Sequence, residues 1–407
     1  MRARRRVAVV LSAALVLILA PSGRSFGSPQ VAWHATLGGS LDASAFGPHG
    51  EIYVTGARGE GSTLEGPMLL ARLTPAGEVL WTRSWRPDPS RPDRFSTAGT
   101  AVDVGADGVV YVGGYVQRYN CEGGGWFVRA YSPGGRLRGW FTTKRAWNCK
   151  TRPESFSDLI VQDDQVIVAG SDYMCCGGSG WFKGWVRAFD RRLRGTWKTA
   201  FEPGPPIPRG YIDRAESLGA ASSGAIFVGG WAATEAFGGD GSSPDRTVVV
   251  QKLTATGGVV WARRLGRVDP APRVTIAVQG ARVMLAVPIE GGGGWLARLD
   301  AGGALVSSRI WGRGPGPGPA PSDLAIDREG STWIVEDRPD PDGGRNVVLR
   351  HYAPSMRFLG TVPLPAAGRW MRAGGVAVGV ASVVATGATS TWSGWRNDGG
   401  HAWRIGW

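Results

Sequence analysis

Three carboxylates stand at the start of expected first strands in three different repeats of the chain. They are Asp158 in FSDL, Glu216 in AESL and Asp323 in PSDL, with Asp42 near the equivalent place. Two carboxylates that converge within about 5 to 10 Å can hydrolyse glycosides, and a ring of them would attract a cation. We favour a simpler interpretation, in which solvated Asp and Glu side chains satisfy local turns.

The histidines form no recognised catalytic motif. His49 falls in a short turn, His34, His351 and His401 fall on outer strands, and no G-x-S-x-G or HExxH sequence occurs. We therefore assign no catalytic residue, no metal ligand and no cofactor from the sequence.

Four cysteines lie in two neighbouring repeats and the loop between them: Cys121, Cys149, Cys175 and Cys176. In an exported protein four cysteines indicate two disulfides, and three pairings are open. A strained bond between the adjacent Cys175 and Cys176 is the least favoured. A zinc site is the alternative, but no CxxC spacing or neighbouring histidine supports it.

Tryptophans beside Gly-rich loops are candidates for ligand binding, because exposed aromatic rings stack on sugars and anchor protein partners. These residues are Trp126, Trp181, Trp231, Trp295, Trp392 and Trp395. The alternative is that Trp126 and Trp295 begin strands and belong to the core. Four other tryptophans hold a regular fourth-strand position that is typical of packing between repeats: Trp81, Trp140, Trp197 and Trp261.

A unit of four short strands, most complete over residues 100–140, positions all of these residues. Its second strand reads IYVTG, VYVGG, VIVAG, IFVGG, VMLAV, TWIVE and VVATG, in seven copies that end 58, 56, 60, 57, 49 and 51 positions apart. Third-strand and fourth-strand patterns recur in phase with it. Repeats of this period are typical of solenoids, propellers and arrays.

The repeats are out of phase with the ends of the chain. VAWHATL, residues 31–37, reads as a fourth strand that precedes any first strand, and the last copy ends at Trp407 after its third strand. Pairing of residues 31–37 beside 402–407 would complete the last sheet and leave no open seam.

We therefore predict an all-β fold, a seven-bladed β-propeller of four-stranded antiparallel blades closed by the N-terminal strand, in one domain over residues 28–407. A β-solenoid or two sandwiches are the alternatives. The expected blades are 39–85, 96–143, 155–201, 213–265, 273–311, 321–364, and 370–407 with 31–37.

The N-terminal segment predicts export. A basic start, MRARRR, an apolar run over Val7–Ala20 and small residues after it are typical of a signal peptide, so residues 1–27 are expected to be removed. An uncleaved anchor is the minor alternative. We expect a secreted, periplasmic or cell-surface monomer with no transmembrane segment after signal removal.

The mature chain is basic, but its charge indicates no nucleic-acid partner. The formal charge of +13 falls to +8 without the five arginines of the signal segment. The remaining arginines are scattered along strands and turns instead of forming a patch.

The repeats resemble known secreted bacterial propellers. A strand ending in Asp, a Gly turn, YVTG or YVGG, a variable loop, an apolar-basic strand and G-x-x-x-W resemble SBBP-type repeats. TPAGEVLW and TATGGVVW are similar to PQQ-binding-like propellers, and YVGG before a later Trp is similar to kelch motifs. The SBBP-type resemblance implies a secreted recognition or scaffold protein.

The two faces of the expected propeller differ in loop length. Loops after first and third strands are short, whereas those after second and fourth strands are long and varied, which favours binding on the long-loop face. We expect a non-enzymatic module that binds a protein or glycan there. The alternative is a carbohydrate-active or quinone-dependent enzyme with its site at the channel mouth.

Overall fold

The computed structural model describes residues 29–59, 61–62, 66–90, 95–118, 124–143, 154–176, 179–201, 213–233, 246–268, 273–289, 292–312, 318–340, 344–365, 370–390 and 396–406. The predicted signal peptide lies outside these residues. Within them the chain forms strands and no helix. The described part therefore contains no helix that is long and apolar enough to cross a membrane.

Five sheets each contain four antiparallel strands. They consist of β2 (Ala43–Phe46), β3 (Ile52–Ala57), β5 (Met68–Leu73) and β6 (Val79–Trp85); β7 (Phe95–Val104), β8 (Val110–Arg118), β9 (Gly124–Tyr131) and β10 (Leu137–Thr142); β11 (Glu154–Gln162), β12 (Gln165–Cys176), β13 (Ser179–Asp190) and β14 (Gly195–Phe201); β15 (Asp213–Ala220), β16 (Ile226–Ala233), β17 (Arg246–Leu253) and β18 (Val259–Val268); and β19 (Thr275–Gln279), β20 (Arg282–Pro288), β21 (Gly294–Leu299) and β22 (Leu305–Trp311).

A further, nine-stranded sheet has two parts that meet at a single parallel pair, Arg345 with Trp370. One part contains β23 (Ala320–Ile326), β24 (Thr332–Pro339), β25 (Arg345–Tyr352) and β26 (Phe358–Leu364). The other contains β27 (Trp370–Val378), β28 (Ser382–Ser390), β29 (Arg396–Gly406) and β1 (Gln30–Leu37), with the short β4 (Gly61–Ser62) beside β29. The predicted all-β fold of four-stranded antiparallel units is confirmed.

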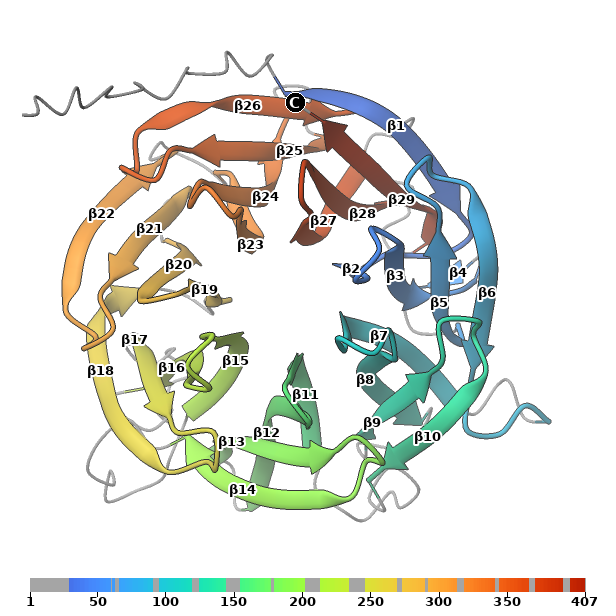
Figure 1. The fold of residues 1–407 in the computed structure, drawn as a ribbon, viewed down its shortest axis with the longest axis horizontal. Coiled ribbons are helices and arrows are strands. Elements are labelled where there is room, and N and C mark those ends of the chain that lie inside the picture. Colours follow the sequence, from blue (N-terminus) through green and yellow to red (C-terminus); the bar gives the residue numbers. More distant parts are fainter. Residues whose placement is uncertain are drawn as a thin grey trace, which may run out of the picture.

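The sheets stand in a ring around a central opening (Figure 1). In each four-stranded unit the first strand lies at the opening, and β6, β10, β14, β18, β22, β26 and β1 lie at the perimeter. This places the residues at the start of the first strands in the channel wall.

The hydrophobic core lies between neighbouring sheets. One cluster packs Tyr53 and Leu70 of the β2–β6 sheet against Val112 and Phe127 of the β7–β10 sheet. Second strands are buried on both faces, as in β16, because each is enclosed by the sheets on either side. Complete burial of a side chain such as Phe127, which is 0% exposed, stabilises the fold by about 1.5–3 kcal/mol.

Polar contacts between neighbouring sheets also recur. In the β2–β6 sheet, Trp81 Nε1 and Arg72 Nη1 both donate to the carbonyl of Pro133, in the β9–β10 turn, at 2.9 Å. In the β15–β18 sheet, Trp261 Nε1 and Lys252 Nζ donate in the same way to Ala301 O, in the β21–β22 turn, each at 3.3 Å. Trp81 and Trp261 therefore join sheets, as their position in the repeat predicts. Trp140 holds the same position but is 62% exposed, so the prediction is wrong for this residue.

The N-terminal strand lies beside the C-terminal strand. β1 pairs antiparallel with β29, from Gln30 opposite Gly406 to Leu37 opposite Gly400. A histidine pair spans the two strands, with His34 Nε2 2.9 Å from His401 Nδ1. His401 Nε2 lies 3.1 Å from Thr389 Oγ1, and both rings stack on Trp403.

The environment of this pair favours neutral imidazoles. Burial lowers the pKa of His34, and burial with the nearby His34 charge lowers the pKa of His401 to about 4. Each neutral ring can donate once and accept once, so His34 can donate to His401, and His401 to Thr389. Two protonated rings would direct N–H groups at each other.

The seam should therefore weaken in acid. A pKa lowered from 6.5 means that the unfolded chain binds a proton that the folded chain does not, so stability falls as pH drops from about 6.5 towards 4. When the pH is lowered from 7.5 to 4.5, we expect the free energy of unfolding to fall less for His401→Gln than for wild type. The difference between the two decreases should be about 1–3 kcal/mol. Urea unfolding at both pH values measures this. The exposed His49→Gln serves as control, and identical pH dependence of the His401→Gln variant and wild type would contradict the role of the pair.

Candidate active site in the central channel

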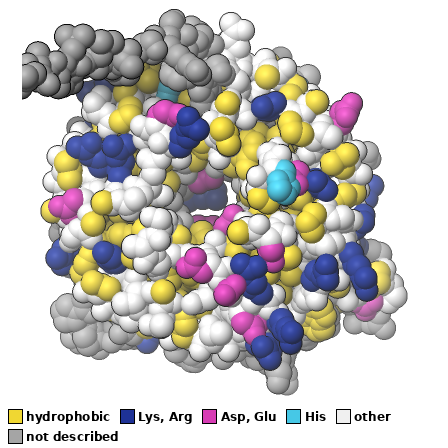
Figure 2. Space-filling view, in the orientation of Figure 1, with side chains coloured by type: hydrophobic (Ala, Val, Ile, Leu, Met, Phe, Trp, Pro, Cys, Tyr) yellow, Lys and Arg dark blue, Asp and Glu magenta, His cyan; other side chains and the backbone are white. Residues whose placement is uncertain are grey.

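Two cavities occupy the channel, and they meet at Asp42, Thr100 and Arg273, which line both. The larger has a volume of about 410 Å³, and its lining residues include Tyr115, Asp337 and Arg372. The smaller has a volume of about 90 Å³ and lies among the inner strands. Acidic and basic side chains are visible in the wall of the central opening (Figure 2).

Bulges in the inner strands supply part of this lining. The register of β7, β11, β15 and β23 shifts at the same point of each strand, which leaves Thr100, Ser157, Glu216 and Ser322 as extra residues. A bulge redirects a side chain that a regular strand would keep in the pleat. All four side chains line one or both cavities.

Asp158 and Asp323 each follow a bulge and join neighbouring inner strands. Asp158 accepts backbone N–H groups from Leu159 and, across the sheet boundary, from Leu218, both at 2.7 Å. Asp323 accepts those of Leu324 at 2.8 Å and Val376 at 2.9 Å. We call this arrangement the aspartate clamp.

The clamp carboxyls hold protons more tightly than ordinary aspartates. Burial raises the pKa of Asp158 from 3.8 to about 7, the charge of Asp323 raises it further, and the backbone N–H bonds oppose the rise. Burial also raises the pKa of Asp323. The two carboxyls affect each other because they face the same small cavity.

Glu216 differs from the clamp aspartates because it comes from the bulge itself. Its carboxylate lies 3.8 Å from Arg214 Nη1, is 16% exposed and receives a side-chain hydrogen bond from Trp231. Burial raises the pKa of Glu216, against the charges of Arg214 and Arg273. A glutamic acid whose pKa is raised keeps its proton to a higher pH than usual and can give it to a bound substrate.

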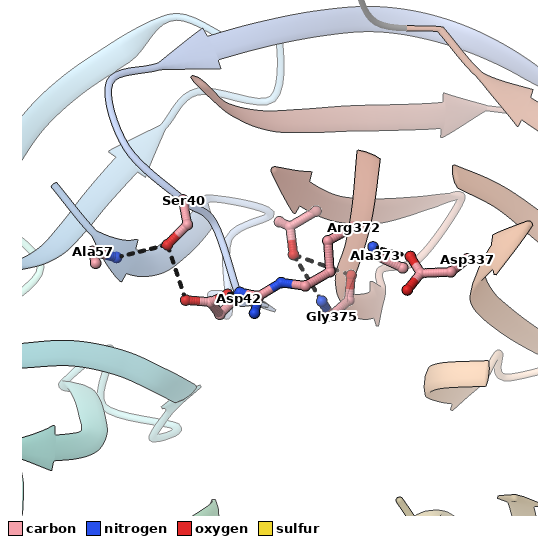
Figure 3. Close-up of polar contacts among 8 residues, drawn as sticks. Ser40, Asp42, Ala57, Asp337, Arg372, Ala373 and Gly375 are labelled. Atoms are coloured by element: carbon pink, nitrogen blue, oxygen red, sulfur yellow. Dashed lines mark hydrogen bonds and ion pairs between the residues drawn. The ribbon is translucent and has the colours of Figure 1, made fainter. Parts of the chain in front are cut away.

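Asp42 forms an ion pair with Arg372 of the neighbouring inner strand β27 (Figure 3). Ser40 Oγ also donates to Asp42, at 3.2 Å. Behind Arg372, Asp337 accepts the backbone N–H of Ala373. The arginine side chain is 57% exposed and the Asp42 carboxylate 17%, so both remain accessible from the channel.

Arg273 is an exposed residue just before β19 and lines both cavities. Its charge acts on Asp158, Glu216 and Asp323. Among the described residues, however, it makes no hydrogen bond or ion pair. Its signal in the sequence is only a basic residue before an inner strand, in RVTIAV, which is recognisable once the inner strands are aligned on their bulges.

The channel thus brings together the three sequence-predicted carboxylates, Asp158, Glu216 and Asp323, on one cavity. The interpretation of these residues as solvated turn carboxylates is wrong, because they line the channel and two of them join strands. Sequence reasoning missed Thr100, Arg273 and Arg372, because only the register of the inner strands shows that they meet the carboxylates.

The tryptophans predicted to bind a ligand are buried or half-buried where the structure describes their side chains. Trp126 is 0% exposed and Trp231 is 3% exposed, so neither offers a free ring face. Trp126 Nε1 donates to Glu154 at 3.0 Å, and Trp231 supports Glu216. Trp295 is half-buried against a core cluster.

The side chains of the other predicted site residues are not among those that the structure describes. Trp392, Trp395, Cys121 and Cys149 are not among the described residues, nor are the side chains of Trp181, Cys175 and Cys176. The disulfides therefore stay a prediction. Within the described ranges, no group of three or more His, Cys, Asp or Glu residues is arranged to hold a metal ion.

No known protein family matches this sequence, and no curated protein matches it. The structure is similar to that of a GH93 α-L-arabinofuranosidase of Fusarium graminearum in complex with arabinobiose, with a TM-score of 0.51 and 11% identity over 78% of this chain and 94% of that one. The same enzyme with an iminosugar inhibitor gives 0.51 and 10% over 81% and 98%. The phage phi92 endosialidase gives 0.49 and 9% over 92% and 69%.

At these identities the likeness shows the fold, which is β-propeller-like. It supports no SBBP-type repeat in particular. It also corrects two interpretations of the sequence, that the chain is a non-enzymatic binding or scaffold module and that it is not an enzyme. The arabinofuranosidase that shares its fold is a carbohydrate-active enzyme, the class named above as the alternative.

Asp158→Asn tests the clamp, because asparagine mimics the protonated acid. A raised pKa means that the folded chain binds a proton that the unfolded chain has released, so this residue lowers stability as pH rises from about 4 to about 7. We expect the variant to gain stability relative to wild type as pH rises. The difference between the two free energies of unfolding, variant minus wild type, should be about 1–3 kcal/mol larger at pH 8 than at pH 5. Urea unfolding measures it, and a difference that is constant with pH would show that Asp158 is ionised throughout.

Proposed function

We propose that the protein is a glycoside hydrolase whose active site lies in the central channel. The observation that carries this proposal is the convergence of carboxylates from several inner strands on one small cavity that continues into a larger one. Cleavage of a glycosidic bond needs two carboxyl groups in different protonation states. The fold shared with a carbohydrate-active enzyme supports the same reaction class.

Glu216 is the proton donor in this proposal. Burial raises its pKa, its carboxyl does not belong to the aspartate clamp, and its bulge directs it into the small cavity. The hydrogen bond from Trp231 orients it. Glu216 would protonate the oxygen of the departing sugar as the glycosidic bond breaks.

Asp42 supplies the second carboxylate. Its ion pair with Arg372 keeps a negative charge at the place where the two cavities meet. That charge stabilises the positive charge that develops at the anomeric carbon. Asp42 would then activate water or attack the anomeric carbon, two routes that the stereochemistry of the product distinguishes.

The aspartate clamp holds this pair in place. Asp158 and Asp323 fix the inner strands that carry Glu216 and face Asp42, and they remain bound to backbone N–H groups. We assign them a positioning role, since both oxygens of each carboxyl already accept hydrogen bonds.

We further propose that the ring is a seven-bladed propeller of SBBP-type repeats whose last blade β1 completes. The antiparallel pairing of β1 with β29 supports this closure. The single domain over residues 28–407, the signal peptide over 1–27, export to a secreted, periplasmic or surface location, and a monomeric state remain part of the same proposal. A glycan is the proposed partner.

Glu216→Gln and Asp42→Asn test the assignment. With a panel of plant, bacterial and animal oligosaccharides, we expect wild type to release sugars and each variant to lose at least about 100-fold in kcat, with an unchanged circular dichroism spectrum. Product release by chromatography measures the rate, and proton NMR of the anomeric signal gives the stereochemistry.

The matched control is Glu329→Gln, a glutamate with a partly exposed side chain in the β23–β24 turn, which should keep full activity. Wild-type rates in the Glu216→Gln variant would remove Glu216 from the mechanism. Release of no sugar by wild type from any oligosaccharide of the panel would overturn the proposed function.

A further inference from the structure

We infer that the channel mouth binds a sugar that carries a carboxylate, and that the Arg273 guanidinium binds this carboxylate. The inference rests on the proposed function and names the substrate class for that site. It starts from the charged groups of the two cavities and from the partners that each of them already has.

The carboxylates of the mouth have protein partners. Asp158 and Asp323 accept backbone N–H groups, and Asp42 pairs with Arg372. Asp337 accepts the N–H of Ala373 and lies 3.7 Å from Arg345. Glu216, described above, has Arg214 and Trp231 beside it.

Arg273 is the exception in this part of the chain. It is exposed into both cavities without a hydrogen bond or ion pair to a described residue. A guanidinium carries five N–H donors in a planar fork that matches a carboxylate at two points. An exposed positive group that lines both cavities without a partner among the described residues is suited to a negative group on the ligand.

A second unsatisfied group belongs to a residue that lines the same two cavities. This residue is Thr100, and its Oγ1 is buried without a hydrogen-bond partner among the described residues. A buried hydroxyl without a partner costs about 1–3 kcal/mol. A ligand with a carboxylate would satisfy Arg273, and an acidic sugar brings this group together with hydroxyl groups for other polar side chains that line the cavities.

The surrounding charges favour a single negative charge over a double one. Arg273 offers one positive charge, whereas Asp42 and Asp337 line the same larger cavity and repel anions. A carboxylate carries one charge, but a phosphate ester carries close to two at neutral pH. The mouth therefore fits a sugar acid better than a phosphorylated sugar.

Acid should strengthen this binding. Burial raises the pKa values of Asp158, Glu216, Asp323 and Asp337, so these carboxyls take up protons at a higher pH than ordinary carboxyls and oppose the ligand less in acid. The sugar carboxylate stays ionised at pH 5.5. The other charged or titratable groups that line the two cavities are Asp42, Tyr115 and Arg372.

The test compares acidic oligosaccharides with their carboxyl-reduced forms. Trigalacturonic acid and α2,3-sialyllactose, each beside the same sugar with its carboxylate reduced to an alcohol, are titrated into wild type at pH 5.5 and 7.5 by calorimetry. For at least one pair we expect the acid to bind at least about tenfold more tightly, and more tightly at pH 5.5 than at 7.5.

The variants are Arg273→Gln and Arg273→Lys, with Arg264→Gln on the exposed outer strand β18 as control. We expect Arg273→Gln to reduce the preference for the acid below about twofold, Arg273→Lys to retain part of it, and Arg264→Gln to retain all of it. Thermal unfolding of each variant shows whether the fold is intact.

The outcomes separate this inference from the proposed function. Three outcomes would overturn the inference, even where Glu216→Gln abolishes turnover. They are equal binding of the acid and the alcohol by wild type, binding of neither by wild type, and a preference for the acid that Arg273→Gln leaves unchanged. If Arg273→Gln only destabilises the fold, Arg273 is a counter-ion of the channel carboxylates and the inference fails. Selective binding of the acid through Arg273 without any turnover would instead contradict the proposed hydrolase activity and support the inferred binding site.

Discussion

The aspartate clamp is the contact on which the channel depends. A carboxyl inside a ring of sheets loses most of its hydration, which costs free energy unless hydrogen bonds replace the water. Asp158 and Asp323 meet this cost with two backbone N–H groups each, one from the same strand and one from the next unit. The clamp therefore sets the spacing of inner strands, and with it the size of the cavity between them.

The same strands explain why the channel carries so many functional groups. A bulge in each of these inner strands adds a residue, and Thr100, Glu216 and Ser322 are such residues. Gly375 shows the limit of this arrangement, because a Cβ there would lie 3.3 Å from Asp323 Oδ2. A small residue in β27 leaves room for the carboxyl from the neighbouring unit.

Much of the fold could be predicted from the sequence, because the repeat encodes it locally. The IYVTG and VYVGG patterns correspond to strands β3 and β8, and the Gly and Pro turns correspond to the short loops between strands.

The site was only partly predictable. The positions of Asp158, Glu216 and Asp323 followed from the repeat, but their burial did not, because Asp before an apolar strand also occurs in solvated turns. Trp231 was misread as an exposed ring because a Gly-rich flank resembles a loop, whereas in β16 it marks close contact between sheets. Arg273 and Arg372 come from distant repeats, and only the arrangement of the sheets around the central opening brings them to the same cavity.

The most direct test of the account is a crystal structure of the Glu216→Gln variant soaked with an oligosaccharide that wild type cleaves. The account predicts a sugar in the channel, with its glycosidic oxygen beside the side-chain amide that replaces the Glu216 carboxyl and with Asp42 on the other side of the scissile bond. A sugar bound on the outer strands or the long loops, with the channel empty, would contradict it.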